Sequence, residues 1–197
     1  DRVCAYAELA ALFTIEQPTK TAVCILADKE EIGSVGISGM QSQYFEHFMG
    51  TLCDAQGVKL YDCFANSFCL SADVSNAYDP NFPETCDKRN NSLLNYGISI
   101  CKYTGRGGKG GSNDCNAEFV AQVRKICDDA EVAWQTAELG KVDVGGGGTI
   151  AYIMAKYGMD VIDSGVALLS MHAPYEVSSK ADVFEAYRGY RAFLKNA

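Results

Sequence analysis

The chain has 197 residues and carries 25 acidic against 17 basic side chains, for a net charge of −8. This acidic balance disfavours broad nucleic-acid binding, which depends on clustered lysine and arginine. The sequence lacks any apolar run near the roughly 20 residues that a membrane-spanning helix needs. We therefore expect neither nucleic acid nor a membrane as a partner. A chain of this length can bury roughly 70% of its unfolded surface, so we expect a hydrophobic core.

The first residues already show helical periodicity, and the chain opens at Asp1 without an initiator methionine or a signal-peptide pattern. We therefore expect a fragment or a processed product of a longer chain. The nine cysteines are odd in number and form no C-x-x-C pair, so neither a disulfide framework nor a thiolate zinc cluster is indicated. Reduced thiols packed as small hydrophobes are the expected state, and they place the protein in a reducing compartment, most simply the cytoplasm.

Predicted strands and helices alternate along the chain. The continuous apolar run at residues 21–27 predicts a buried strand. The run GRGGKGGSND predicts a flexible loop, and Asp114 is the expected N-cap of the helix that follows. This alternation predicts an α/β domain with a mixed, largely parallel sheet flanked by helices. The predicted helices are 2–16, 41–55, 114–129, 149–157 and 179–195, the predicted strands are 21–27, 64–72, 98–103, 131–137, 161–162 and 167–171, and residues 76–96 are predicted to be irregular.

Polar side chains follow several of the predicted strands at the point where each strand ends. Glu30 and Glu31 come shortly after the first strand, Asp73 follows the second, and His172 follows the last. Ligands gather at the carboxyl ends of strands in α/β sheets. Carboxylates with a neutral imidazole suit Zn²⁺, Mn²⁺ or Co²⁺. Each residue also has a structural interpretation: the glutamates as a solvated turn, Asp73 as a turn cap, and His172 as a structural histidine.

Two glycine-rich runs invite a phosphate-binding interpretation. Gly145–Gly148 precedes a predicted helix, whose N-terminus could bind an anion. The run lacks the Lys-Ser/Thr of a P-loop and the spacing of a dinucleotide fingerprint, so the pattern disfavours a nucleotide site. For the Lys-containing run at 105–111, we favour mobility over phosphate binding.

Four segments together resemble one family. ADKEEIGSVGISGMQS, SADVSNAYDPNF, DVGGGGTIA and SMHAPYE are similar, in this order, to motifs of the aspartyl aminopeptidase (aminopeptidase I) family of zinc metallopeptidases. The opening DRVCAYAEL also resembles a helix start of that family. The resemblance covers nearly the whole chain. It implies that residues 1–197 are the C-terminal part of one zinc-aminopeptidase-like catalytic domain, and that an upstream segment with further metal ligands and an oligomerisation insert lies outside them.

The resemblance implies a role for each polar residue at the strand ends. Two divalent metal ions, zinc first and cobalt or manganese as alternatives, share a water molecule in such sites. Glu30 would be the general base. Glu31 and His172 would bind one ion, and Asp73 would bind the other. Asp28 would orient His172 or stabilise its own loop.

The resemblance also implies a substrate side of the site. Gly147 and Gly148 would line the substrate pocket, where side chains would block approach. Lys102 is similar to a family lysine that faces an acidic substrate side chain. Asn76 and Asp79 stand where many members have histidines, one of which serves a neighbouring subunit, so strict acidic specificity does not follow from the resemblance.

The sequence thus predicts a metal-dependent aminopeptidase that removes N-terminal residues from peptides, with acidic residues as a candidate preference. The resemblance implies a homo-oligomer, commonly a dodecamer. Two alternatives stay open: a related dinuclear amidohydrolase that acts on small amides, and a catalytically silent scaffold. The presence of Glu30, Glu31, Asp73 and His172 together argues against the silent scaffold, because buried charges without partners cost stability.

Overall fold

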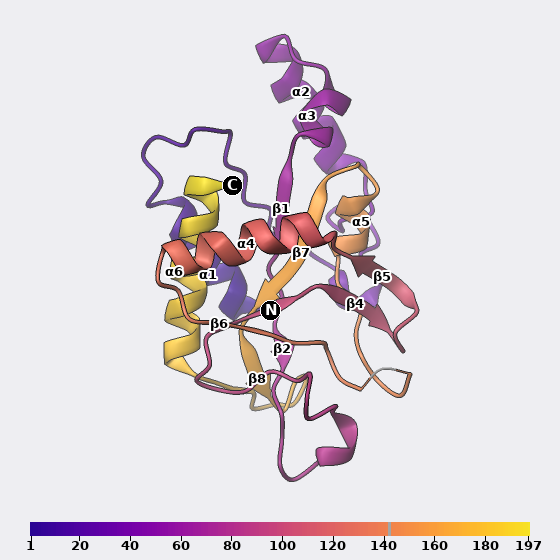
Figure 1. The fold of residues 1–197 in the computed structure, drawn as a ribbon. Coiled ribbons are helices and arrows are strands. Elements are labelled where there is room, and N and C mark those ends of the chain that lie inside the picture. Colours follow the sequence, from indigo (N-terminus) through magenta and orange to yellow (C-terminus); the bar gives the residue numbers. More distant parts are fainter. Residues whose placement is uncertain (142) are drawn as a thin grey trace.

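A four-stranded sheet in the order β1-β7-β3-β6 is the centre of the fold in the computed structural model, which describes residues 1–141 and 143–197 (Figure 1). β7 (Asp160–Gly165) pairs parallel with β1 (Phe68–Ser71) and antiparallel with β3 (Ile98–Cys101). β3 pairs parallel with β6 (Trp134–Thr136). The mixed, largely parallel sheet is therefore confirmed. β3 is buried along its whole length, as expected of a strand that is covered on both faces.

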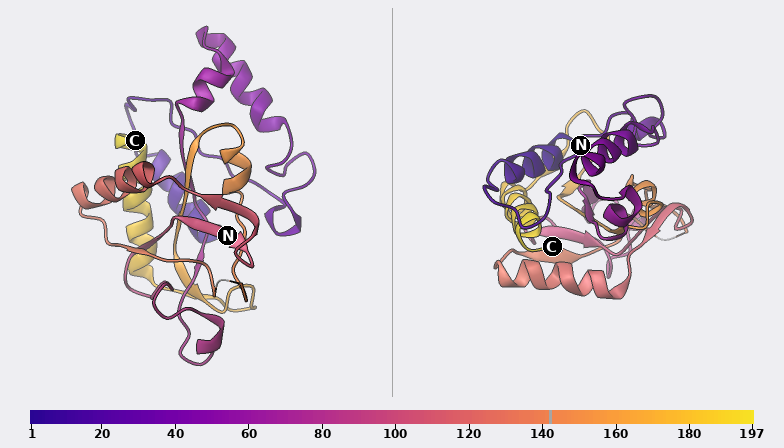
Figure 2. Two further views of the ribbon diagram at one scale, coloured as in Figure 1. Left: turned by 45° about the vertical axis from the view of Figure 1, so that its right-hand side comes forward. Right: turned by 90° about the horizontal axis from the view of Figure 1, so that it is seen from above.

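Helices cover both faces of this sheet, as predicted (Figure 2). The helices are α1 (Arg2–Leu12), α2 (Tyr44–Gln56), α3 (Leu60–Ala65), α4 (Ala117–Asp129), α5 (Ala151–Ala155) and α6 (Lys180–Asn196). Ile162 of β7 packs in a core with α1, α4 and α6, whereas its neighbour Val161 packs in a second core with α5. Successive side chains of a strand point to opposite faces, so β7 contributes to both cores. α2 and α3 extend away from the sheet at the top of Figure 1.

Capping side chains decide where the helices begin. The Asp1 carboxylate accepts a hydrogen bond from the Cys4 N–H at 3.0 Å, which starts α1. Asn116 accepts from the Phe119 N–H at 2.7 Å and is the N-cap of α4. The prediction of Asp114 as this N-cap is therefore wrong. Asp114 ends a strand instead, and its carboxylate pairs with the Lys102 ammonium group.

The run GRGGKGGSND forms a β-hairpin, so the prediction of a flexible loop is wrong. β4 (Tyr103–Arg106) pairs antiparallel with β5 (Gly110–Asp114). Gly107 and Gly108 form the turn with φ of 58° and 73°, a left-handed conformation that glycine adopts without strain. Glycine thus turns the chain here, and the flanking residues pair.

The remaining predicted elements are found with shifted boundaries. The first helix ends at Leu12, four residues before the predicted end at 16, and α3 was not predicted. The predicted irregular region contains little regular structure beyond a 3-10 turn, η2 (Pro83–Thr85). A small second sheet joins β2 (Ser75–Asn76), β8 (Ala167–Leu169) and β9 (Val177–Ser178).

No helix formed by residues 1–141 and 143–197 combines the length and the apolar character that crossing a bilayer requires.

The predicted strand at residues 21–27 is not formed. This segment lies outside every strand of the sheet, and Leu26 is 57% exposed. It lines one wall of a groove of about 700 Å³, whose other wall includes β1. β1 has a sheet neighbour, β7, on one side only. The segment has the composition of a buried strand, but the described residues place no strand beside it.

Glu8 of α1 also lines this groove. Burial raises the pKa of its carboxyl group from 4.5 to about 7, and a hydrogen bond from Cys24 partly offsets that rise. Cys4, Cys69 and Tyr190 are the other titratable groups whose charge couples to Glu8.

The raised pKa predicts how stability changes with pH. Between pH 4.5 and about 7 the folded protein holds a proton on Glu8 that the unfolded chain has lost, so this group makes the free energy of unfolding fall as pH rises. Glu8→Gln should flatten this part of the pH profile, measured by chemical denaturation at several pH values. Glu16→Gln, at an exposed position, is the control. An unchanged slope in Glu8→Gln would contradict the assignment.

Candidate metal centre

A tight turn presents the two adjacent glutamates. They lie in a 3-10 helix, η1 (Glu30–Ile32), whose flanking residues Lys29 and Gly33 both have left-handed backbones with φ of 63° and 98°. The Ser34 N–H donates to the Lys29 carbonyl at 2.7 Å and closes the turn. A Cβ at Gly39 would lie 2.3 Å from the Ser34 carbonyl oxygen, so only glycine fits there.

His172 and Glu31 come together from opposite ends of the chain. His172 follows β8, and its Nδ1 lies 3.7 Å from Glu31 Oε1. Its backbone is left-handed, with φ of 67°, and its N–H donates to Glu176 Oε1 at 2.5 Å. Such a backbone is uncommon for a residue other than glycine and often marks a functional site. The side chains of His172 and Glu31 are 66% and 69% exposed, so the pair faces solvent.

Asp73, after the end of β1, lies within the electrostatic reach of Glu30. Burial, with smaller contributions from the charges of Glu30 and Asp163, raises the pKa of Asp73 to about 7, against a hydrogen bond from the Val74 N–H at 2.8 Å. Burial also raises the pKa of Glu30, with a smaller contribution from the adjacent charge of Glu31. Like charges brought together in a partly buried site disfavour ionisation.

The described residues fit a partial metal site. Burial, with a smaller contribution from neighbouring carboxylates, raises the pKa values of two carboxyl groups, Glu30 and Asp73, and a divalent cation would stabilise their ionised forms. Oxygen and imidazole nitrogen donors also suit zinc. No group of three or more potential ligands within residues 1–141 and 143–197 is close enough to hold an ion unaided. The structure therefore contains a Glu31–His172 pair and a separate Asp73.

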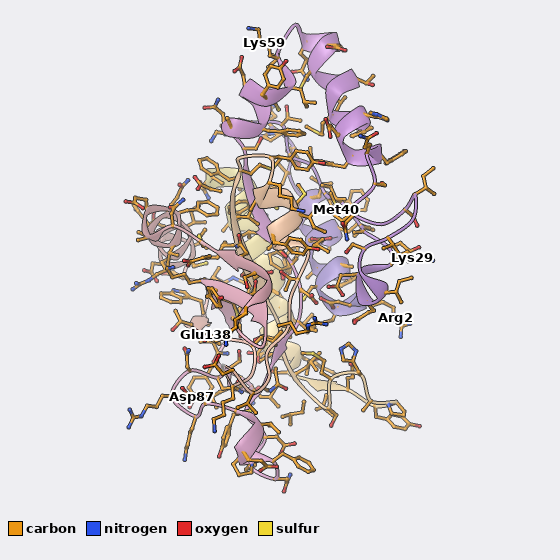
Figure 3. All side chains as sticks on the ribbon, turned by 90° about the vertical axis from the view of Figure 1, so that its right-hand side faces the viewer. Arg2, Lys29, Met40, Lys59, Asp87 and Glu138 are labelled. Carbon is orange, nitrogen blue, oxygen red and sulfur yellow. The ribbon has the colours of Figure 1, made fainter. Side chains whose placement is uncertain are left out.

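The N-terminus of α1, which is the positive end of the helix dipole, lies near Glu30 and Asp73. Asp1, the N-cap of α1, lies within electrostatic reach of both Glu30 and Asp73. Arg2, at the start of α1, and Lys29 lie on the same side of the molecule (Figure 3). Residues far apart in the sequence thus meet at one edge of the fold.

Lys102 makes its ion pair outside this cluster. Its ammonium group pairs with Asp114 across the base of the β4–β5 hairpin, and 51% of its side chain is exposed. The Asp114 carboxylate raises the pKa of Lys102. Among the described residues, Lys102 forms neither a hydrogen bond nor an ion pair with Glu31 or His172.

Gly147 and Gly148 pack against the same hairpin. The Gly147 carbonyl accepts a hydrogen bond from the Gly105 N–H at 3.0 Å. A Cβ at Gly147 would lie 2.5 Å from Leu139 Cδ2, and one at Gly148 would lie 3.3 Å from the Gly111 carbonyl oxygen. Close packing therefore explains both glycines, against the Leu139 side chain at Gly147 and against the Gly111 backbone at Gly148. A substrate-lining role stays a prediction.

Two further residues near the site were not assigned a role from the sequence. Glu176 holds the His172 backbone, and the motif SMHAPYE contained that signal. Asp163 is a carboxylate in the middle of a buried strand, and its place beside the apolar residues Val161 and Ile162 was also visible in the sequence. Asp28 binds within its own loop, where it accepts from the Lys29 N–H at 2.8 Å and the Ser38 hydroxyl at 3.1 Å.

Comparison with known proteins identifies the family. Residues 1–194 match the model of the aminopeptidase I zinc metalloprotease (M18) family. The chain is 54% identical, over 200 residues, to a probable M18 family aminopeptidase 1 of Clostridium acetobutylicum, covering all of this chain and 43% of that protein. The corresponding protein of Thermotoga maritima is 46% identical and is covered over 44% of its length. The chain therefore belongs to the M18 family of zinc metallopeptidases.

Solved structures agree with this assignment. Aminopeptidase I of Clostridium acetobutylicum superimposes with a TM-score of 0.93 over all of this chain and 43% of its own. An M18 aminopeptidase of Thermotoga maritima gives a TM-score of 0.95 at 45% identity, again over all of this chain and 45% of its own. The chain thus spans less than half the length of these relatives.

The tight turn around Glu30 and Glu31 predicts that substitution by alanine destabilises the protein far more at Gly39 than at Gly50. Gly39→Ala should lower the free energy of unfolding by about 1–3 kcal/mol, because the new Cβ would collide with the Ser34 carbonyl. Gly50→Ala, inside α2, is the matched control, because its Cβ would meet Leu60 at an ordinary 3.8 Å. Chemical denaturation measures both. Equal stability of the two variants would show that the turn is not constrained in this way.

Proposed function

We propose that the protein containing residues 1–197 is a metal-dependent aminopeptidase that removes N-terminal residues from peptides. The observation that carries the proposal is the convergence of Glu30, Glu31, Asp73 and His172 at one edge of the fold, in a chain of the M18 family. We expect two divalent ions per site, zinc first and cobalt or manganese as alternatives.

Each residue takes one task in this reaction. Glu31 and His172 hold one ion, and Asp73 holds the other. The chemistry that the bound ions supply is polarisation of the scissile carbonyl and activation of a water molecule. Glu30 takes the proton of that water on its carboxylate and passes it to the leaving amine. Burial raises the pKa of Glu30 above its ordinary value, and a more basic carboxylate accepts a proton more readily.

The proposed substrate-binding residues are Lys102, Gly147 and Gly148. We propose that the backbone of Gly147 and Gly148 lines the substrate pocket, where the lack of side chains allows close approach. Lys102 keeps half of its side chain exposed while it is paired with Asp114, so it can also face an acidic substrate side chain. On this basis acidic N-terminal residues belong among the expected substrates.

The partial ligand set supports a larger catalytic domain. We propose that residues 1–197 form its C-terminal part and that the remaining part supplies a strand between residues 21–27 and β1, together with further ligands. Three observations support this: the open groove of about 700 Å³, the unpaired side of β1, and a chain that spans 43% of its Clostridium acetobutylicum relative.

The proposal also includes the oligomeric state of the protein and its cellular compartment. The mature yeast aminopeptidase 1 solved as a dodecamer superimposes with a TM-score of 0.77 at 27% identity, over 99% of this chain and 44% of its own. We therefore propose a homo-oligomer, with a dodecamer as the expected size. All nine cysteines are free thiols, which supports a reducing compartment such as the cytoplasm.

The additional strand proposed between residues 21–27 and β1 predicts a change in the hydrogen exchange of residues 21–27. In the isolated chain the backbone amides of residues 21–27 lack strand partners and should exchange rapidly, whereas in the intact protein strand pairing should slow them by about tenfold or more. The amides of β3, which are paired in both forms, are the control. Equally fast exchange of residues 21–27 in both forms would rule out the added strand.

The roles of Glu30 and His172 predict opposite defects in the intact protein. Glu30→Gln should keep its metal and lose activity by about 10²–10⁴-fold, because an amide cannot accept the proton. His172→Ala should lose metal content, measured by elemental analysis. His47→Ala, on the exposed surface of α2, is the control.

Chelator-sensitive release of N-terminal residues from aminoacyl amides is the activity to measure. Near-normal turnover of Glu30→Gln would remove Glu30 as the base, and full metal content in His172→Ala would remove His172 as a ligand. Hydrolysis only of acylated substrates would instead favour an amidohydrolase. Absence of both metal and activity in the intact protein would favour a silent scaffold.

A further inference from the structure

Three buried serine side chains form a hydrogen-bonded chain that begins two residues after Asp73, and the proposed mechanism does not use them. Ser75 Oγ lies 3.0 Å from Ser92 Oγ, which in turn lies 2.6 Å from Ser99 Oγ. Ser75 Oγ also lies 3.9 Å from Cys101 Sγ, a weak partner. Ser75 is 2% exposed and the other two serines are 0% exposed. A hydroxyl both donates and accepts, so neighbouring members of this serine chain satisfy each other without water.

The serine chain joins three separate segments of the protein. Ser75 begins β2, Ser92 lies between η2 and β3, and Ser99 lies within β3 of the central sheet. Hydrogen bonds are directional, and a buried network whose members are all satisfied rigidifies its surroundings. The three hydroxyls therefore define the relative position of these segments more closely than apolar packing at the same places would.

The segment around Ser92 also holds the backbone of β2. The Tyr78 N–H donates to the Ser92 carbonyl at 2.7 Å, and the Asn91 side-chain amide donates to the Asn76 carbonyl at 3.0 Å. These bonds keep residues 91–92 alongside β2. The side-chain bond from Ser92 to Ser99 then attaches this pair of segments to β3.

The far end of the serine chain leads back to Asp73. Ser99 pairs in register with Gly165 of β7. The Asp73 backbone lies directly against this glycine, because a Cβ at Gly165 would lie 1.6 Å from the Asp73 carbonyl oxygen. The segment from Asp73 to Ser75 is thus held against the sheet at both ends, by its contact with Gly165 and by the serine chain.

β2 also connects Asp73 to the other part of the candidate metal centre. β2 pairs parallel with β8, and the Ser75 N–H donates to the Val166 carbonyl at 2.9 Å beside this pairing. The chain beyond β8 leads to His172. The position of β2 therefore determines where Asp73 lies relative to His172.

We propose that Ser75, Ser92 and Ser99 are positioning residues, whose serine chain fixes β2 against β3 and so holds Asp73 in the place where it binds its ion. The metal-binding part of this inference rests on the proposed function, because it takes Asp73 as a metal ligand. The ordering of β2 rests on the hydrogen bonds alone.

The test compares variants of the intact protein. Ser92→Ala removes the middle hydroxyl and deprives those of Ser75 and Ser99 of their shared partner. The triple variant Ser75→Ala, Ser92→Ala, Ser99→Ala removes the whole serine chain and leaves none of its hydroxyls without a partner. Ser164→Ala is the matched control, because Ser164 is also 2% exposed but its side chain points to the opposite face of β7 from Gly165.

Hydrogen exchange and zinc affinity are the two readouts. Peptides that contain residues 75–78 should exchange about tenfold faster in Ser92→Ala and in the triple variant, because β2 opens locally. The affinity for one of the two Zn²⁺ ions, titrated into metal-free protein, should fall about 10–100-fold in both, because Asp73 is no longer held in place. Ser164→Ala should leave both readouts at their wild-type values.

The triple variant separates positioning from a merely structural role. Its free energy of unfolding should recover relative to Ser92→Ala, because an unpaired buried hydroxyl costs more than a hydroxyl that is absent. Its exchange and its zinc affinity should not recover, because β2 still lacks its attachment to β3. Recovery of both readouts in the triple variant would overturn the proposal, since the serines would then only need partners.

The remaining outcomes are equally decisive. Wild-type exchange of residues 75–78 in both serine variants would overturn the proposal, and so would equal effects in Ser164→Ala. Faster exchange with unchanged zinc affinity would overturn the part that concerns Asp73. If the wild-type protein binds no metal, the proposed function fails, and the exchange measurement still decides whether the serine chain orders β2. If Ser92→Ala does not fold, Ser99→Ala and the triple variant decide the result.

Discussion

The parallel pairing of β1 with β7 determines where the functional residues lie. The two strands meet in register from Phe68–Asp160 to Ser71–Asp163, and the chain beyond β1 turns closely over Gly165. A Cβ at Gly165 would lie 1.6 Å from the Asp73 carbonyl oxygen, so only glycine allows this approach. Parallel strands carry their carboxyl ends to the same edge of a sheet, so this pairing brings Asp73 to the end of the fold at which β8 leads to His172.

The carboxylates at that edge determine which ligands it can bind. Burial raises the pKa values of Glu30 and Asp73 there, and the charges of neighbouring carboxylates add to the rise. Such a cluster is costly in a protein that lacks a cation and suitable for one that binds a divalent ion. The exposed Glu31–His172 pair and the half-buried Asp73 also differ in their surroundings, which suits two ions with different access to solvent.

Local sequence patterns predicted much of the fold. The apolar runs around β1, β3 and β7 and the amphipathic pattern of α6 are strong local signals, and each of these elements is present. The patterns failed where pairing partners decide the structure. The run GRGGKGGSND pairs with itself as a hairpin, and residues 21–27 remain unpaired although their composition is that of a strand.

The sequence by itself determined the identity of the site residues, because polar side chains that interrupt or end apolar runs are visible without a structure. It placed Glu30, Glu31, Asp73 and His172 at the ends of extended segments, and it showed the motif order of a family whose model matches residues 1–194. The tertiary structure alone decided which of these residues meet, since Glu31 and His172 lie more than 100 residues apart in the sequence. It paired Glu31 with His172, engaged Lys102 with Asp114, and brought the Thr104 hydroxyl to Asp163, because such contacts depend on how the chain closes and not on local propensity.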